Sequence, residues 1–149
     1  MNQLTEALIE FHQAFGHPVS EHKLEEDTDA LRGFLELRKT LIREECEELC
    51  EALDLRDEEN VIKEAADLLY VTVGTLVGLV GYAPVEEAFK AVHESNMSKL
   101  VNGKPVYRED GKIIKGPNYK APDMKPFSPG KQWVGLSEAD LEKLRNVIL

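Results

Sequence analysis

The chain has 149 residues, of which 42% are hydrophobic and 31% charged, a composition typical of a single globular domain. Its formal net charge of −10 argues against the basic face that nucleic-acid phosphates require, so we expect no nucleic-acid partner. The longest apolar run, residues 68–83, is short for a membrane span, and the first residues lack the pattern of a signal peptide. With its two cysteines only one helical turn apart, we expect a reduced, cytoplasmic protein that does not contact a membrane.

Four helices are predicted in the first part of the chain. Leucine and phenylalanine recur at three- and four-residue spacing over residues 2–15. A longer helix is predicted over residues 29–55, where no proline interrupts the chain. Asp57 can cap a third helix that runs to about Gly81, and a fourth is predicted over residues 85–100. The third helix is apolar nearly all round after its first turns, so we expect it to be central and buried.

The remainder of the chain predicts a different kind of structure. Residues 104–116 alternate around an Asp110-Gly turn, which indicates a hairpin, and a proline-rich stretch follows. Ser137 can cap a short terminal helix. The sequence therefore predicts an all-α fold, a four-helix bundle with a C-terminal hairpin and loop extension and a short terminal helix. We expect a helical domain over residues 1–103 and an extension over residues 104–149 that packs on the same domain or on a partner chain.

The stretch REECEE at residues 43–48 raises the question of whether its glutamates face solvent or the core. On a helical wheel Glu45 falls near the centre of the apolar stripe, Glu48 at its edge and Glu44 just beyond it. An isolated carboxylate on a core face is costly unless it is paired or bound to a metal. Glu45 therefore needs a cation. The stripe consists of Phe34, Leu41, Ile42, Leu49, Ala52 and Leu53.

The third helix supplies a second acidic pair. From Glu64 onward, Glu64 and Asp67 are its only acids, and their spacing of three residues places them on one face. Two helices that each present such a pair can bring four carboxylates around hard divalent cations, and Mg²⁺ and Mn²⁺ prefer oxygen ligands of this kind. The alternative is that the glutamates of the second helix are solvated surface charges. The central position of Glu45 and the second pair in an apolar helix favour the metal site.

Other metal chemistries fit the sequence less well. Di-iron bundles use Glu-x-x-His, and no histidine here is preceded by glutamate at that spacing. A calcium loop is excluded because Arg32 stands where such a loop requires glycine. Cys46 and Cys50 could form half of a zinc site, but the chain has no other cysteine, so we expect them to pack in the core.

The motif EECEE, followed after 15 residues by EAAD, resembles the EExxE…ExxD signature of the all-α nucleoside triphosphate pyrophosphohydrolases. That group includes MazG-like proteins, dimeric dUTPases and phosphoribosyl-ATP pyrophosphohydrolases. The stretch VHESNMSKLVNGKPVYREDGKIIKGPNY is similar to a bacterial MazG-like subgroup with dUTP-hydrolysing members. The resemblance covers residues 11–123 and implies that the four helices form a MazG-like catalytic domain.

The resemblance implies an activity and a set of site residues. Glu45, Glu48, Glu64 and Asp67 match the Mg²⁺ ligands, for which Mn²⁺ is a possible substitute, and Glu44 matches a glutamate that assists the attacking water. The implied reaction is hydrolysis of a nucleoside triphosphate to the monophosphate and pyrophosphate, with dUTP the expected substrate and nucleotide-pool cleaning the expected role. The implied assembly is a homodimer or a dimer of dimers.

Substrate contacts are predicted outside the metal site. Asn96 and Lys99, one turn apart on the fourth helix, can donate to the departing pyrophosphate. Phe15, at the end of the first helix with Phe11 and His12, can stack on a base, although a core role for the two phenylalanines is the favoured alternative. Surface charge is the alternative for the residues of the basic extension. Those predicted to contact substrate there are Lys104, Arg108, Lys112, Lys115 and Tyr119.

Two further functions remain open on sequence grounds. One is a phosphoribosyl-ATP pyrophosphohydrolase, which the extended basic tail disfavours. The other is a helical dimerisation module that kept the fold and lost the activity. Intact acids at all five signature positions argue against such a module, because unpaired buried carboxylates destabilise a fold without their metal.

Overall fold

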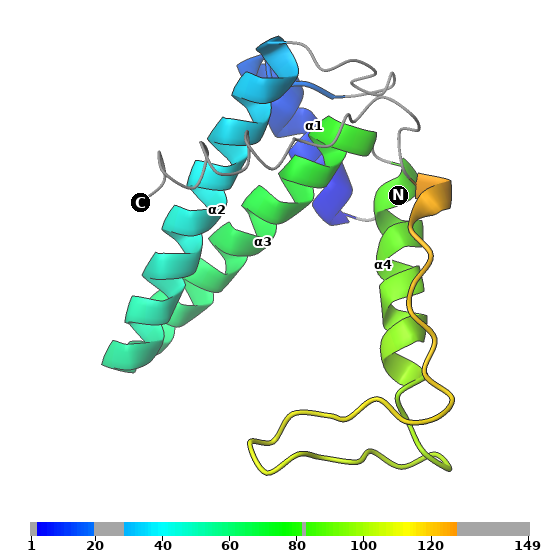
Figure 1. The fold of residues 1–149 in the computed structure, drawn as a ribbon. Coiled ribbons are helices and arrows are strands. Elements are labelled where there is room, and N and C mark those ends of the chain that lie inside the picture. Colours follow the sequence, from blue (N-terminus) through cyan, green and yellow to red (C-terminus); the bar gives the residue numbers. More distant parts are fainter. Residues whose placement is uncertain (1–2, 20–28, 82, 128–149) are drawn as a thin grey trace, which may run out of the picture.

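The computed structural model describes residues 3–19, 29–81 and 83–127. The four predicted helices are present, and no named strand forms within the described residues, so the prediction of an all-α four-helix fold is confirmed (Figure 1). The predicted helix after Ser137 lies outside the described residues. The elements are α1 (Gln3–Phe15), α2 (Asp29–Leu55), α3 (Glu58–Val80), α4 (Ala83–Met97) and the short 3-10 helix η1 (Lys125–Phe127).

Helix α3 is the centre of the fold. It packs most extensively against α2, then against α1, and makes a smaller contact with α4. Helices α2 and α3 form a long pair joined by a tight turn, in which Arg56 adopts a left-handed conformation with φ of 55° (Figure 1). The carboxylate of Asp57 accepts the backbone N–H of Asn60 at 3.2 Å and so begins α3 as predicted.

The apolar core lies at the end of the α2–α3 pair that faces α1. One cluster contains Leu8 and Val77, and a second contains Phe34 and Leu79. Gly78 lets α2 approach α3 closely, because a Cβ atom there would lie 2.3 Å from Phe34 Cζ. This tight packing fixes the angle at which the two helices run on toward their shared turn.

The expectation that α3 is central and buried is confirmed for its place between the other helices, but its burial is incomplete. Leu69 and Leu76 are 47% and 37% exposed, because the described helices α1, α2 and α4 do not cover the whole of its surface. On α1, Leu4 is half exposed while Thr5 is buried, because the face that contacts α3 is rotated from the predicted stripe. In the described chain no single helix is long and apolar enough to cross a membrane, although α3 together with the following helix, as a sharply bent pair, has the length and composition to do so.

The predicted hairpin is present as a narrow loop with isolated bridges. Tyr107 pairs with Ile113, the Arg108 N–H donates to Lys112 O at 2.7 Å, and the Arg108 guanidinium pairs with Asp110 inside the turn. The hairpin extends away from the helices, and the chain then returns along α4 (Figure 1). There the Ser95 hydroxyl donates to Lys120 O at 2.7 Å, so the extension is anchored on α4.

Candidate metal centre

Three carboxylates converge between α2 and α3. Glu45 and Glu48 come from consecutive turns of α2 and Glu64 from the first half of α3, and one carboxylate oxygen of each lies within 4.8 Å of the other two. Glu64 is 4% exposed, Glu45 is half-buried and Glu48 is exposed. The site therefore leads from the helix interface out to solvent, and it could hold a metal ion.

Two oxygens in this cluster have no partner. Glu45 Oε2 and Glu64 Oε2 are buried and accept no hydrogen bond from the described residues. A buried acceptor left without a donor is costly, and a carboxylate oxygen more so. Because hard divalent cations take carboxylate oxygens as ligands, a bound cation would satisfy both atoms. The residues present thus fit a metal ion of this class.

The negative charges of the clustered carboxylates are only partly balanced by the positive charge of Lys63. The pKa of Glu45 is raised, first by burial and then by the negative charges of Asp67, Glu48 and Glu64, while Lys63 opposes the rise. The pKa of Glu48 is raised chiefly by the charge of Glu64 and a hydrogen bond with it. A divalent cation would reverse both effects, since it favours the ionised form of each ligand.

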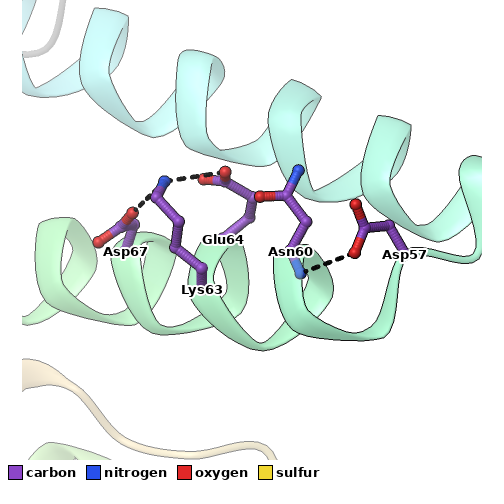
Figure 2. Close-up of polar contacts among 5 residues, drawn as sticks. All are labelled: Asp57, Asn60, Lys63, Glu64 and Asp67. Carbon is purple, nitrogen blue, oxygen red and sulfur yellow. Dashed lines mark hydrogen bonds and ion pairs between the residues drawn. The ribbon is translucent and has the colours of Figure 1, made fainter.

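Asp67 is not part of the converging three. Figure 2 shows it one turn along α3 from Glu64, with the Lys63 side chain between them. Lys63 Nζ lies 2.9 Å from Glu64 Oε1 and 2.9 Å from Asp67 Oδ2. Sequence reasoning missed Lys63, although it lies four residues before Asp67, a spacing at which a lysine on a helix can reach an acid.

Glu44 lies on the solvent side of the cluster. Its side chain is exposed, and its charge contributes to the raised pKa of the neighbouring Glu48. A carboxylate in this place is free to accept a proton from a water molecule that approaches the cluster. The predicted role of Glu44 is compatible with this position and stays a prediction.

The predicted substrate contacts on α4 and the extension are placed apart from the carboxylates. Lys99 Nζ donates to Asn96 Oδ1 at 2.8 Å, and Lys115 Nζ lies 4.6 Å from the centre of the Tyr119 ring. Among the described residues, no hydrogen bond or ion pair joins these side chains or Arg108 to the four acids. Figure 1 shows α4 and the hairpin standing off from the α2–α3 pair. Within the described residues of one chain, these side chains and the carboxylates therefore do not meet.

An aromatic cluster lies where α1 ends beside α3. The Phe11 ring is 4.5 Å from the Phe15 ring and 5.5 Å from the Tyr70 ring, measured between centroids. Tyr70 follows Asp67 by one turn of α3, so the cluster neighbours the carboxylates along that helix. Phe15 is 67% exposed, and the core role favoured for it is therefore wrong.

Two polar side chains beside this cluster, Arg38 and His12, are buried, which sequence reasoning did not predict. Arg38 is 5% exposed and donates to Val71 O at 2.6 Å and to Thr75 Oγ1 at 2.9 Å. His12 is fully buried, with Nδ1 2.8 Å from Pro18 O and with Nε2 unpartnered among the described residues. Burial lowers the pKa of both groups. A lone arginine in a helix reads as surface charge, so no pattern signals its burial.

The two cysteines do not lie where the sequence predicted them. Cys46 and Cys50 are both free thiols, and both are exposed, so the expected core role is wrong for this chain. The apolar stripe continues past them to Ala52, which is buried, so the two thiols lie outside the part of α2 that packs in the core. Glu45 and Glu48 of the motif, and not the thiols, converge with Glu64 of the neighbouring helix.

More than half of the chain matches a known protein family. A family described as phosphoribosyl-ATP pyrophosphohydrolase matches residues 8–96. The matched segment runs from α1 to the end region of α4 and includes all four candidate ligands. A comparison with curated proteins gives no match.

Proposed function

Because the chain belongs to the phosphoribosyl-ATP pyrophosphohydrolase family, of the all-α MazG-like pyrophosphohydrolase superfamily, we propose that it is a Mg²⁺-dependent nucleoside triphosphate pyrophosphohydrolase. The reaction would split the bond between the α and β phosphates to give a monophosphate and pyrophosphate. The observation that supports this most directly is the convergence of Glu45, Glu48 and Glu64, with buried oxygens that accept no hydrogen bond from the described part of the chain. Mn²⁺ could take the place of Mg²⁺, since both prefer oxygen ligands.

The acids have separate tasks in this proposal. Glu45, Glu48 and Glu64, joined by Asp67, would hold the cation. A bound cation supplies positive charge that neutralises the triphosphate and makes the phosphorus more electrophilic. The cluster would otherwise repel the substrate, because both carry negative charge. Glu44, exposed at the edge of the cluster, would accept the proton of the attacking water at its carboxylate.

The leaving pyrophosphate needs hydrogen-bond donors or positive charge, and Lys63 beside the cluster is already paired with Glu64 and Asp67. We assign this task to Asn96 and Lys99, with Arg108, Lys115 and Tyr119 of the extension. Since these residues stand off from the carboxylates in one chain, a homodimer or a dimer of dimers would bring them to the site of a neighbouring chain. The exposed apolar side chains of α3 and α4 support such an interface. They include Leu69, Leu76, Phe89 and Val92.

The base would occupy the aromatic cluster. Phe15 is exposed and lies against Phe11, which in turn contacts Tyr70 of α3, one turn beyond Asp67. Aromatic faces stack on any base, so this feature supports nucleotide binding without choosing a base. We propose dUTP as the preferred substrate, and nucleotide-pool cleaning in the cytoplasm as the role, on the resemblance of the segment after α4.

A second candidate substrate is phosphoribosyl-ATP. The observation that favours it is the family match itself, which carries that description over residues 8–96. The chemistry at the phosphates would be the same, and only the groups beyond the triphosphate differ. Both substrates therefore belong in one assay.

The test is pyrophosphate release with Mg²⁺ from dUTP, the other common nucleoside triphosphates and phosphoribosyl-ATP. Glu45→Gln is run beside Glu47→Gln, a matched control whose exposed carboxylate lies outside the cluster. We expect release from dUTP that is lost in Glu45→Gln and kept in Glu47→Gln.

The other results would change the proposal in defined ways. Release from phosphoribosyl-ATP alone would establish the second candidate. Release spread evenly over the panel would keep the reaction and discard dUTP. No release from any substrate would leave a helical dimerisation module as the better description of the protein.

A further inference from the structure

Lys63 lies at the rim of the candidate metal centre and bridges two of its acids. Its ammonium group is 2.9 Å from Glu64 Oε1 and 2.9 Å from Asp67 Oδ2, so one positive charge is shared between them (Figure 2). Both acceptors are carboxylates that we propose as metal ligands. The lysine thus contacts two of the carboxylate groups that a cation would need, through Oε1 of Glu64 and Oδ2 of Asp67.

This bridge differs from an ordinary ion pair on a helix surface. The Lys63 side chain is 61% exposed, whereas the Glu64 side chain it contacts is only 6% exposed. By contrast, Lys90 and Glu94 on α4 have the same four-residue spacing as Lys63 and Asp67, but their charged atoms are 3.8 Å apart and their side chains are 75% and 65% exposed. Lys63 therefore reaches from solvent to a buried carboxylate, where its charge is screened less.

The bridge also accounts for the position of Asp67. The carboxylates of Glu45, Glu48 and Glu64 converge, but Asp67 is not in that group. Its Oδ2 is held by Lys63 instead. For all four acids to hold one cation cluster, the contact between Lys63 and Asp67 must open.

We propose that Lys63 is an internal counter-ion that competes with the metal: its ammonium group holds Glu64 and Asp67 until a divalent cation binds, and is then displaced. The inference rests on the proposed function, because it takes these acids as metal ligands. Mg²⁺ lies about 2.0–2.1 Å from its oxygen ligands, closer than an ammonium nitrogen can come. Two cations on the same carboxylates repel, and the divalent one is held more strongly. Metal binding is therefore an exchange, and Lys63 sets its affinity.

Removal of the lysine charge has opposite effects on the two states of the protein. Without metal, the clustered carboxylates lose their internal cation and repel one another more. With metal, no ammonium group has to be displaced. Lys63→Gln therefore lowers the thermal stability of the metal-free protein and tightens metal binding. A lysine that merely supported the fold would weaken both.

The experiment measures Mn²⁺ affinity by electron paramagnetic resonance, on the full chain and without substrate. Wild type is compared with Lys63→Gln and with Lys90→Gln as the matched helix control. We expect Lys63→Gln to bind Mn²⁺ about three- to tenfold more tightly, the range that one or two partly exposed ion pairs would give. Lys90→Gln should bind as wild type does. Equal or weaker binding by Lys63→Gln would overturn the inference.

A second measurement needs no variant and remains decisive if Lys63→Gln does not fold. The side-chain nitrogen resonance of Lys63 is followed by NMR while wild-type protein is titrated with diamagnetic Mg²⁺. Displacement predicts a shift that saturates with metal binding, and a resonance that does not move at saturation refutes it. If wild type binds neither metal, the metal-dependent function itself fails, which is distinct from binding that Lys63 does not influence.

Discussion

Glu45 shows how a single side chain can report on the metal site. Its pKa is raised because the carboxylate is desolvated and lies near the negative charges of Asp67, Glu48 and Glu64, while Lys63 opposes the rise. A raised pKa means that the folded protein binds a proton more readily here than the unfolded chain does. The stability that this group contributes is complete below its ordinary pKa of 4.5 and is lost as the pH rises through the folded value.

The first prediction follows from that sign. In the metal-free protein, the stability of wild type relative to Glu45→Gln should fall as the pH rises from 4.5 toward neutrality, because glutamine cannot ionise. Urea unfolding of both chelated proteins across this range measures the difference. A difference that stays constant with pH would mean that Glu45 is solvated and that the cluster does not form.

A second prediction concerns metal removal. If the buried oxygens of Glu45 and Glu64 hold a cation, Mg²⁺ should raise the thermal midpoint and a chelator should lower it. At a metal concentration about 100 times the dissociation constant, the stabilisation is about 2.7 kcal/mol. Differential scanning calorimetry measures the shift, with Glu45→Gln as the variant that should not respond. If the thermal midpoint of wild type does not change with Mg²⁺, these acids do not form a metal site.

At the scale of elements, the packing of α3 on α2 depends on small residues. A Cβ atom at Gly78 would lie 2.3 Å from Phe34 Cζ, and Phe34 is buried. A Cβ atom added at Gly33 on α2 would have none of the described residues' other side chains within 4 Å. Substitution at Gly78 therefore tests helix packing, whereas substitution at Gly33 tests helix propensity alone.

The third prediction uses this pair. Gly78→Ala should lower the free energy of unfolding by about 1–2 kcal/mol, because overpacking outweighs the helix propensity gained. Gly33→Ala should raise it by up to about 1 kcal/mol, since only the propensity changes. Denaturant unfolding of the metal-free proteins measures both. A stabilising Gly78→Ala would show that α2 and α3 are not held at this distance.

The elements also show how far the sequence could be read. Helix bounds were predictable because caps and breakers are local: Asp57 begins α3 and Gly81 ends it. The orientation of Glu45 and Glu64 toward the interface between α2 and α3 was predictable, because both lie on otherwise apolar helix faces. The burial of Arg38 and His12 was not, because it depends on how α1, α2 and α3 cross, which no single helix encodes. For the same reason the contact face of α1 was misplaced.

At the scale of the whole molecule, the division of labour between α2–α3 and the rest of the chain is the main feature. The carboxylates lie on the first pair, and the predicted phosphate donors lie on α4 and the hairpin beyond it (Figure 1). Sequence alone assigned these residues to one site, but it could not say whether they meet within a chain or between chains. Phe89 of α4 is 74% exposed, which leaves an apolar face for another copy to cover.

The last prediction tests whether the site is shared between two chains. Glu45→Gln and Lys99→Ala should each be inactive, the first for lack of a metal ligand and the second for lack of a phosphate donor. If carboxylates of one chain work with Lys99 of the other, a mixed dimer contains one site with both residues intact. Unfolding and refolding the two variants together at equal concentration should then restore about a quarter of wild-type pyrophosphate release, since half of the dimers are mixed and each has one working site of two. The same mixture without refolding is the control. If no activity returns although the mixed dimers form, the donors act on the carboxylates of their own chain, and α4 must close onto the α2–α3 pair when substrate binds.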